Sequence, residues 1–129
     1  MSVITDLTCA DLTAAYRRGE LSPVEVVRDC LARIEASAAF NAFLPIEPAG
    51  ALQAAAESQA RWRVGNPLGP IDGVPASIKD NIWAKGLATR RGSKTSDPAP
   101  AAEDSPAAAR MSKLSKIRSI CFCKAARTR

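Results

Sequence analysis

The chain has 129 residues, enough for one domain or part of one, and 47% of them are apolar while only 5% are aromatic. No run of 18 apolar residues occurs, which excludes a transmembrane helix, and the amino terminus lacks the pattern of a secretory signal. We therefore expect a cytoplasmic protein without membrane contact. The four cysteines lack the spacing of a zinc site and the chain has no histidine, so neither a metal nor a cofactor is predicted.

The net charge of +5 is unevenly distributed along the chain. Residues 1–111 carry 12 Lys and Arg against 13 Asp and Glu, a net charge of −1. Residues 112–129, called the basic tail below, carry six Lys and Arg and no acid. Charge runs at chain ends are usually solvated, and no nucleic-acid-binding motif accompanies this one, so we expect no specific nucleic-acid partner. The tail is expected to be disordered or an isolated helix.

Two amphipathic helices are predicted near the amino terminus. The first begins at Thr8 and ends before Gly19. The second begins at Ser22, where Pro23 suits the first helical position and Glu25 completes a capping box. The short connection between them predicts a helical hairpin. The apolar stripe of the second helix consists of Val24, Val27, Leu31 and Ile34.

A third, alanine-rich helix is predicted over residues 49–64, where Gly65 stops it. Residues 40–46, before it, predict a short strand or extended segment, with Pro45 at its edge or end. Helical periodicity places one set of side chains of the third helix on a common face: Leu52, Ala55, Ala56, Gln59, Ala60 and Arg63.

Residues 69–81 predict a rigid turn that leads into a short strand. The prolines of this stretch fix φ, and its glycines allow sharp reversals of the backbone. Alternation along the strand places Ala76 and Ile78 on one face and Ser77 and Lys79 on the other. Lys79 must then be either solvent-facing or partly desolvated. If it is desolvated, its pKa falls and the neutral amine becomes a usable general base.

Residues 83–93 are predicted to form a loop after this strand. Residues 97–106 form a polar, proline-rich stretch. A further helix is predicted to start at Pro106, with Asp104 or Ser105 as its cap.

In their order and content, these elements resemble the amidase signature family over residues from about 11 to about 111. Each motif alone is weak, but the co-linear set is specific. The resemblance is carried by Leu21-Ser22-Pro23-Val24-Glu25, Asn41-Ala42-Phe43, Gly69-Pro70-Ile71-Asp72-Gly73-Val74-Pro75 and Ser77-Ile78-Lys79-Asp80-Asn81, followed by Gly86, Thr89, Gly92 and Ser93. It implies an α/β fold with a mixed sheet flanked by helices. This chain would hold only the helical hairpin, a further helix and the first strands of that incomplete fold.

The resemblance also implies an activity, the hydrolysis of carbon–nitrogen amide bonds in small-molecule amides. The family's catalytic unit is a serine nucleophile, a second serine in a cis peptide and a lysine, and Lys79 corresponds to that lysine by position. Its neutral amine would take a proton relayed from the nucleophile and later help to return one to the leaving nitrogen.

The 129 residues contain no Gly/Ser-rich run of the kind that carries the family's two serines. We therefore expect a truncated, frameshifted gene product. It would consist of a partial amidase domain over residues 1–111 and an unrelated tail over residues 112–129. Such a chain is expected to have no turnover alone. The alternative is a small non-catalytic binding module that pairs with an intact amidase or, through its basic tail, with an anionic partner.

The remaining polar residues of the motif region favour structural roles. Ser77 and Ser93 lack a placed base, so neither is expected to act as a nucleophile. Asp80 and Asn81 are expected to hold the turn after the strand by side-chain to backbone hydrogen bonds, and Trp83 is expected to pack. A partial fold would also leave a sheet edge uncovered, which predicts marginal stability and self-association.

Overall fold

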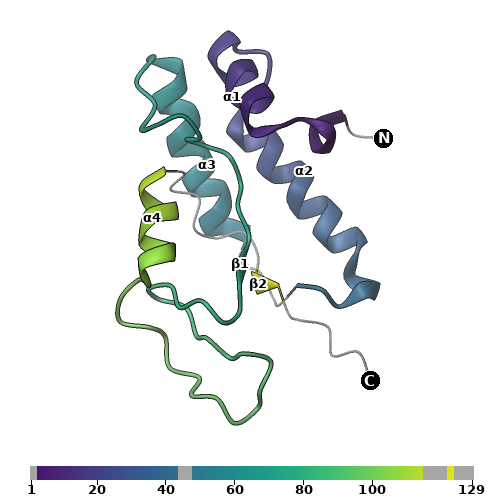
Figure 1. The fold of residues 1–129 in the computed structure, drawn as a ribbon. Coiled ribbons are helices and arrows are strands. Elements are labelled where there is room, and N and C mark those ends of the chain that lie inside the picture. The colour runs from purple at the N-terminus through teal and green to yellow at the C-terminus, as the bar shows by residue number, and fades with distance from the viewer. Residues whose placement is uncertain (1–2, 44–47, 115–121, 124–129) are drawn as a thin grey trace.

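The computed structural model describes residues 3–43, 48–114 and 122–123 (Figure 1). The amino-terminal part is helical and consists of η1 (Val3–Asp6), α1 (Cys9–Arg18), α2 (Pro23–Ala36), η2 (Ala38–Phe40) and α3 (Pro48–Arg63), where η marks a 3-10 helix. The strand β1 (Ile78–Lys79), the helix α4 (Pro106–Leu114) and the strand β2 (Phe122–Cys123) follow. Within these ranges no helix is both long and apolar enough to cross a membrane.

The predicted starts of α1 and α2 are confirmed, because each helix has a complete capping box. The Thr8 hydroxyl accepts a hydrogen bond from the Asp11 amide at 3.2 Å, and the Asp11 carboxylate accepts one from the Thr8 amide at 2.9 Å. Ser22 and Glu25 make the same reciprocal pair at 3.2 and 2.8 Å. Each box satisfies amides that have no partner within the first turn of a helix.

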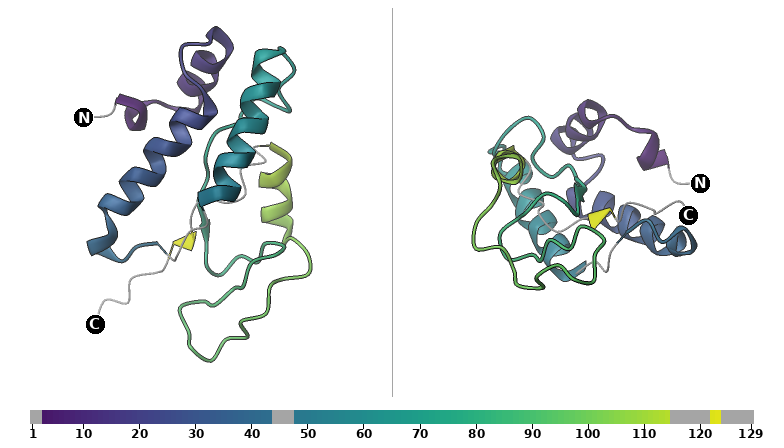
Figure 2. Two further views of the ribbon diagram at one scale, coloured as in Figure 1. Left: turned by 180° about the vertical axis from the view of Figure 1, so that it is seen from behind. Right: turned by 60° about the horizontal axis from the view of Figure 1, so that its bottom comes forward.

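The closest helix packing is that of α2 against α3, whereas the sequence predicted that the first two helices pack on each other. Val27 of α2 and the small residues Ala51 and Ala55 of α3 are fully buried at this contact. Partly buried side chains surround them, including the rest of the predicted stripe, Val24, Leu31 and Ile34. Figure 2 shows α2 and α3 side by side from behind.

A second apolar cluster joins α1 to this pair of helices. Leu12 and Tyr16 of α1 pack with Val26 of α2 and Trp62 of α3. The rings of Tyr16 and Trp62 lie 5.9 Å apart between centroids, in a tilted arrangement that aromatic pairs favour. The helix α2 therefore buries two faces, and the predicted stripe identified only the face that contains Val27.

The predicted face of α3 is right for Leu52 and Ala55, which belong to the core around Val27, but wrong for most of its other residues. The buried side chains of this helix are those of Ala51, Ala55, Ser58 and Trp62, while Arg63 is exposed, as are Ala56 and Ala60. An alanine-rich helix has little contrast between its faces, so its periodicity does not identify the side that small residues bring against a neighbour.

The strand predicted over residues 40–46 is also wrong at its start. Phe40 ends a 3-10 helix and leaves 79% of its surface exposed, and Asn41 has a left-handed backbone with φ of 48°. A left-handed residue cannot continue a strand, so the extended segment cannot begin before Ala42. Residues 44–47 lie outside the described part of the chain.

One of the carboxyl-terminal elements, β2, lies beside the strand that follows the turn. β1 pairs in parallel with β2, with Ile78 opposite Phe122. The helix α4 is capped by Ser105, whose hydroxyl accepts a hydrogen bond from the Ala108 amide at 3.2 Å, and this decides between the two predicted caps. The helix α4 continues from residue 111 to residue 114 and so crosses the predicted domain boundary without a break. The boundary itself stays a prediction. Most of the basic tail lies outside the described residues.

Candidate active-site segment

The turn before β1 is fastened to α3 by a buried carboxylate. We call residues 69–75 the anchor turn. The side chain of Asp72 is fully buried and makes a bidentate ion pair with Arg61, at 2.8 Å to Nε and 2.7 Å to Nη2. The same carboxylate accepts a hydrogen bond from the Leu68 amide at 3.0 Å. Burial alone would raise the pKa of Asp72, but these hydrogen bonds outweigh burial and hold the pKa below its usual value.

Two aromatic side chains hold the backbone of the anchor turn. The Trp62 indole N–H donates to the Asp72 carbonyl at 2.9 Å, and the Tyr16 hydroxyl donates to the Gly73 carbonyl at 3.2 Å. Burial raises the pKa of Tyr16, so its phenol keeps the proton that this bond requires. The anchor turn is thus tied to α1 and α3 through neighbouring carbonyls.

Gly73 lies where no larger residue fits. A Cβ atom at this position would come within 2.5 Å of the Ser58 hydroxyl and 2.7 Å of the Pro23 ring. Its φ of 84° is also a conformation that residues with a Cβ rarely adopt. The glycine therefore lets the backbone of the turn lie directly between α2 and α3.

The fastened turn sets the direction of the strand that carries Lys79. Along residues 76–79 the side chains alternate as predicted, with Ile78 buried at 8% exposure and Ser77 and Lys79 exposed. Of the two alternatives for Lys79, the described chain has the solvent-facing one. No described residue forms a hydrogen bond or an ion pair with its amine.

Asp80, directly after this lysine, organises the loop that follows. Its carboxylate is 3% exposed and accepts hydrogen bonds from the amides of Arg90 at 2.9 Å and Gly92 at 3.1 Å. Its carbonyl accepts a third from the Arg91 amide at 3.0 Å. The predicted structural role of Asp80 is confirmed. The loop therefore folds back onto the residue next to Lys79.

The other predicted residues of this region do not join the lysine. Ser93 bonds the hydroxyl of Thr95 at 2.9 Å, and Asn81 is exposed. Trp83 leaves 44% of its surface exposed, so the predicted packing is only partial.

A small hollow of about 250 Å³ lies beside the segment that enters β1, lined by Cys30, Arg33 and Ile34 of α2, by Phe43 and by residues 75–77. Burial raises the pKa of the Cys30 thiol, which opposes formation of a nucleophilic thiolate there.

The amidase family model matches residues 25–125, which include the anchor turn, Lys79 and Asp80. The chain belongs to the amidase family. The match extends past Met111 into the basic tail as far as residue 125.

This amidase-family chain matches only a short segment of each of the curated relatives described next. A mitochondrial glutamyl-tRNA(Gln) amidotransferase subunit of Ixodes scapularis is 40% identical over 88 residues, which are 68% of this chain and 17% of that protein. The corresponding glutamyl-tRNA(Gln) amidotransferase subunit of Salinispora tropica is 42% identical over 95 residues, 73% of this chain and 19% of that protein. The chain thus spans less than a fifth of the length of these relatives.

Solved amidase structures share its fold. The native peptide amidase from Stenotrophomonas maltophilia superposes with a TM-score of 0.76 at 29% identity, covering 88% of this chain and 24% of the peptide amidase. A fatty acid amide hydrolase superposes with a TM-score of 0.79 at 25% identity, covering 93% of this chain and 21% of that enzyme. The predicted fold, the amino-terminal part of the α/β amidase signature fold, is confirmed.

The residues that fasten the anchor turn were missed by the sequence analysis of this amidase-family chain. Asp72 carried a usable signal, because it is the one charged residue within residues 69–75. No such signal marked its partners Arg61 and Trp62, or Tyr16, which bonds to Gly73, since nothing in their spacing links two helices to a distant turn.

Proposed function

We propose that this chain supplies the lysine-bearing segment of an amide hydrolase. In this proposal the neutral amine of Lys79 accepts a proton that a second serine relays from the serine nucleophile, and later helps to return a proton to the leaving nitrogen. The observation that carries the proposal is the position of Lys79. It lies at the end of a strand that the anchor turn aims, inside the stretch that matches the amidase family.

Because Lys79 is exposed, it would have to be desolvated before it could serve as a general base. An exposed amine keeps its hydration shell, whereas a lysine that serves as a general base is desolvated. The described residues leave Lys79 open to solvent. We infer that further protein must cover this lysine and bring both serines to it, and that the 129-residue chain alone has no turnover.

The substrate class in this proposal is a carbon–nitrogen amide. By name, the similar solved structures are a peptide amidase and a fatty acid amide hydrolase, and the similar sequences belong to a tRNA-dependent amidotransferase. These names share amide chemistry but not a substrate. The choice among amides therefore falls to residues outside this segment.

A chimera tests the role of Lys79. Residues 1–114 of this chain replace the matching amino-terminal segment of the Stenotrophomonas maltophilia peptide amidase, and ammonia release from a peptide amide is measured. We expect Lys79→Ala to lower kcat by about 10²- to 10⁴-fold, the usual contribution of a general base. The matched control is Lys85→Ala, because Lys85 is another exposed lysine further along the same loop region. Equal rates for the two variants would refute the assignment.

A second assay tests the proposed inactivity of the chain alone. The purified 129-residue protein is incubated with a simple carboxamide, and ammonia is measured beside the Lys79→Ala variant. We expect no difference between the two proteins. Ammonia release that disappears with Lys79→Ala would show that the chain is itself an enzyme, and would overturn this part of the proposal.

A further inference from the structure

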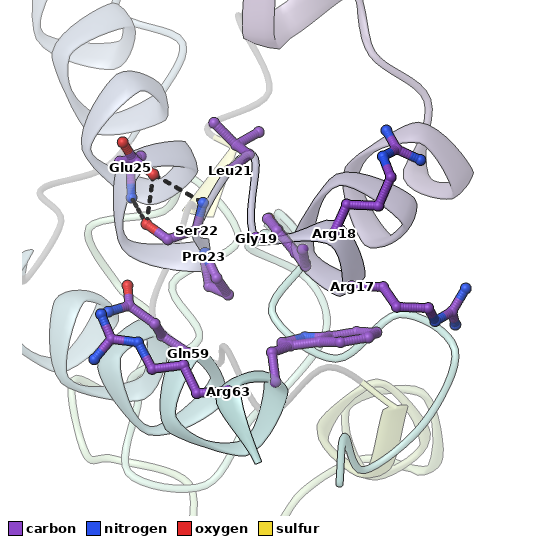
Figure 3. Close-up of a pocket in the computed structure, with 11 residues that line it drawn as sticks. Arg17, Arg18, Gly19, Leu21, Ser22, Pro23, Glu25, Gln59 and Arg63 are labelled. Atoms are coloured by element: carbon purple, nitrogen blue, oxygen red, sulfur yellow. Dashed lines mark hydrogen bonds between the residues drawn. The ribbon is translucent and has the colours of Figure 1, made fainter. Parts of the chain in front are cut away.

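A polar pocket of about 530 Å³ lies where the end of α1, the start of α2 and the end of α3 meet (Figure 3). Its volume is within the usual range of ligand pockets, roughly 300–1,000 Å³. The buried rings of Tyr16, Pro23 and Trp62 contribute to its lining. The pocket contains neither Lys79 nor Asp80 and is separate from the candidate active-site segment.

Three side chains at this pocket have hydrogen-bonding groups that the described chain does not use. Arg17 and Arg63 form no ion pair with a described carboxylate, and the half-buried amide of Gln59 has no hydrogen-bond partner among the described residues. Arg17 instead lies 5.8 Å from the centroid of the Trp62 ring, a cation–π distance. Two guanidinium groups without a described partner, one of them over a buried aromatic ring, favour an anionic ligand.

The acidic side chains of the pocket are already occupied. The Glu25 carboxylate accepts hydrogen bonds from the amide and the hydroxyl of Ser22, at 2.8 and 2.7 Å. Glu20, beside the pocket, pairs with Arg18 at 2.8 Å. The charges left without a described partner are therefore those of Arg17 and Arg63, both positive.

The two free guanidinium groups point in opposite directions. In Figure 3 the side chains of Gln59 and Arg63 extend together toward one side, below Ser22 and Glu25, and Arg17 extends toward the other. Because the two groups diverge, an extended ligand with spaced negative charges suits them better than a single small anion.

We propose that this pocket binds an acidic peptide segment. Carboxylates of the peptide would pair with Arg17 and Arg63 at the two ends, its backbone would meet the Gln59 amide, and apolar parts would rest on Trp62. The fixed carboxylate of Glu25 favours a peptide over a nucleic acid, because a continuous row of phosphates would place negative charge against it. The proposal is independent of the catalytic role of Lys79.

Trp62 provides the reporter for the test. The chain has two tryptophans, so Trp83→Phe leaves Trp62 as its single tryptophan, which excitation at a wavelength selective for tryptophan reports without Tyr16. This protein is titrated with a short blocked peptide of alternating glutamate and glycine, and with the same peptide carrying glutamine for glutamate. We expect a saturable change in fluorescence with the acidic peptide only. Arg17→Gln and Arg63→Gln should each weaken binding about twofold to fivefold, the usual worth of an exposed ion pair, and the double variant should weaken it further.

Arg28→Gln is the matched control, because Arg28 is an exposed arginine of α2 that does not line this pocket. It should bind the acidic peptide like the parent protein. The basic tail also attracts acidic peptides, but binding there predicts no dependence on Arg17 or Arg63. Arg63→Lys keeps the charge and should bind better than Arg63→Gln, which separates lost charge from lost folding.

Three outcomes would overturn the proposal. The first is the absence of a saturable change in Trp62 fluorescence. The second is equal weakening by Arg28→Gln and Arg63→Gln, which would indicate unspecific attraction. The third is tighter binding of a single-stranded oligonucleotide than of the acidic peptide, which would assign the pocket to nucleic acid.

Discussion

Two regions that meet at Pro75 are held in different ways. The first, which we call the clamp, consists of α1, α2, α3 and the anchor turn. Its side chains interlock, through the ion pair of Asp72 with Arg61 and the bonds of Trp62 and Tyr16 to the turn. The second is the lysine segment, residues 76–105. There the loop is held through its backbone amides, which donate to the buried Asp80 carboxylate, to the Asp104 carboxylate and to carbonyls of the loop itself.

The difference shows which part of the chain is held in place by contacts among its own side chains. In the clamp, the polar groups of the buried Tyr16, Trp62 and Asp72 find partners within the described chain. In the lysine segment Lys79 faces solvent. The clamp aims the strand, and under the proposed function other protein would supply the surroundings that a catalytic lysine needs. The predictions below test this division.

The largest effect is expected from Asp72→Asn in the clamp. The change removes the charge that pairs with Arg61, and breaking a buried ion pair by removing one partner costs about 3–5 kcal/mol. The free energy of unfolding, measured by urea denaturation, should fall by about this amount. The matched control is Asp29→Asn, because Asp29 pairs with Arg33 on the surface of α2. Its cost should be about 0.3–0.5 kcal/mol. Similar costs for the two variants would remove the basis for calling the first region a clamp.

Gly73→Ala should have the next largest effect, and Gly86→Ala is its control. The two glycines have nearly the same φ, 84° and 83°, so both variants bear the same backbone strain of about 1 kcal/mol. Only at Gly73 would the new Cβ meet other atoms, the Ser58 hydroxyl and the Pro23 ring. Overpacking adds about 1–3 kcal/mol. The difference in unfolding free energy between the variants therefore measures how tightly the turn lies between α2 and α3, and no difference would contradict the described packing.

Asp80→Ala should act locally in the lysine segment. It removes the acceptor for the Arg90 and Gly92 amides, each bond contributing about 1 kcal/mol. Hydrogen exchange at these two amides should become faster, while exchange in α2 and α3 should change little. Equal acceleration in the helices would show that the two regions unfold as one unit, and the comparison would then fail.

Predictions from the sequence were most successful where the local conformation depends on residues close together in the sequence. The caps at Thr8, Ser22 and Ser105 follow from local chemistry and were predicted. Most of the face of α3 and the partners of Asp72 were not, because they depend on contacts between segments far apart in the sequence. The place of Lys79 on the exposed face of a strand end was predicted from its motif, but the choice between exposure and desolvation was not, since that depends on what else covers the strand.

The smallest effect is a pH dependence that belongs to the clamp. The pKa of Asp72 is lowered from its usual 3.8, so the unfolded chain binds a proton there at higher pH than the folded chain does. The stability that this carboxylate contributes is therefore complete above the unfolded-state pKa and is lost as the pH falls through the lowered folded-state value. Asp11 and Glu20 also have lowered pKa values, from their hydrogen bonds with Thr8 and Arg18, so acid should weaken every variant to some extent. Urea denaturation at neutral pH and at successively lower pH should show the gap between the parent protein and Asp72→Asn narrowing in acid. A gap that stays constant would mean that Asp72 acts by its shape alone, and that the ion pair with Arg61 does not stabilise the turn that aims Lys79.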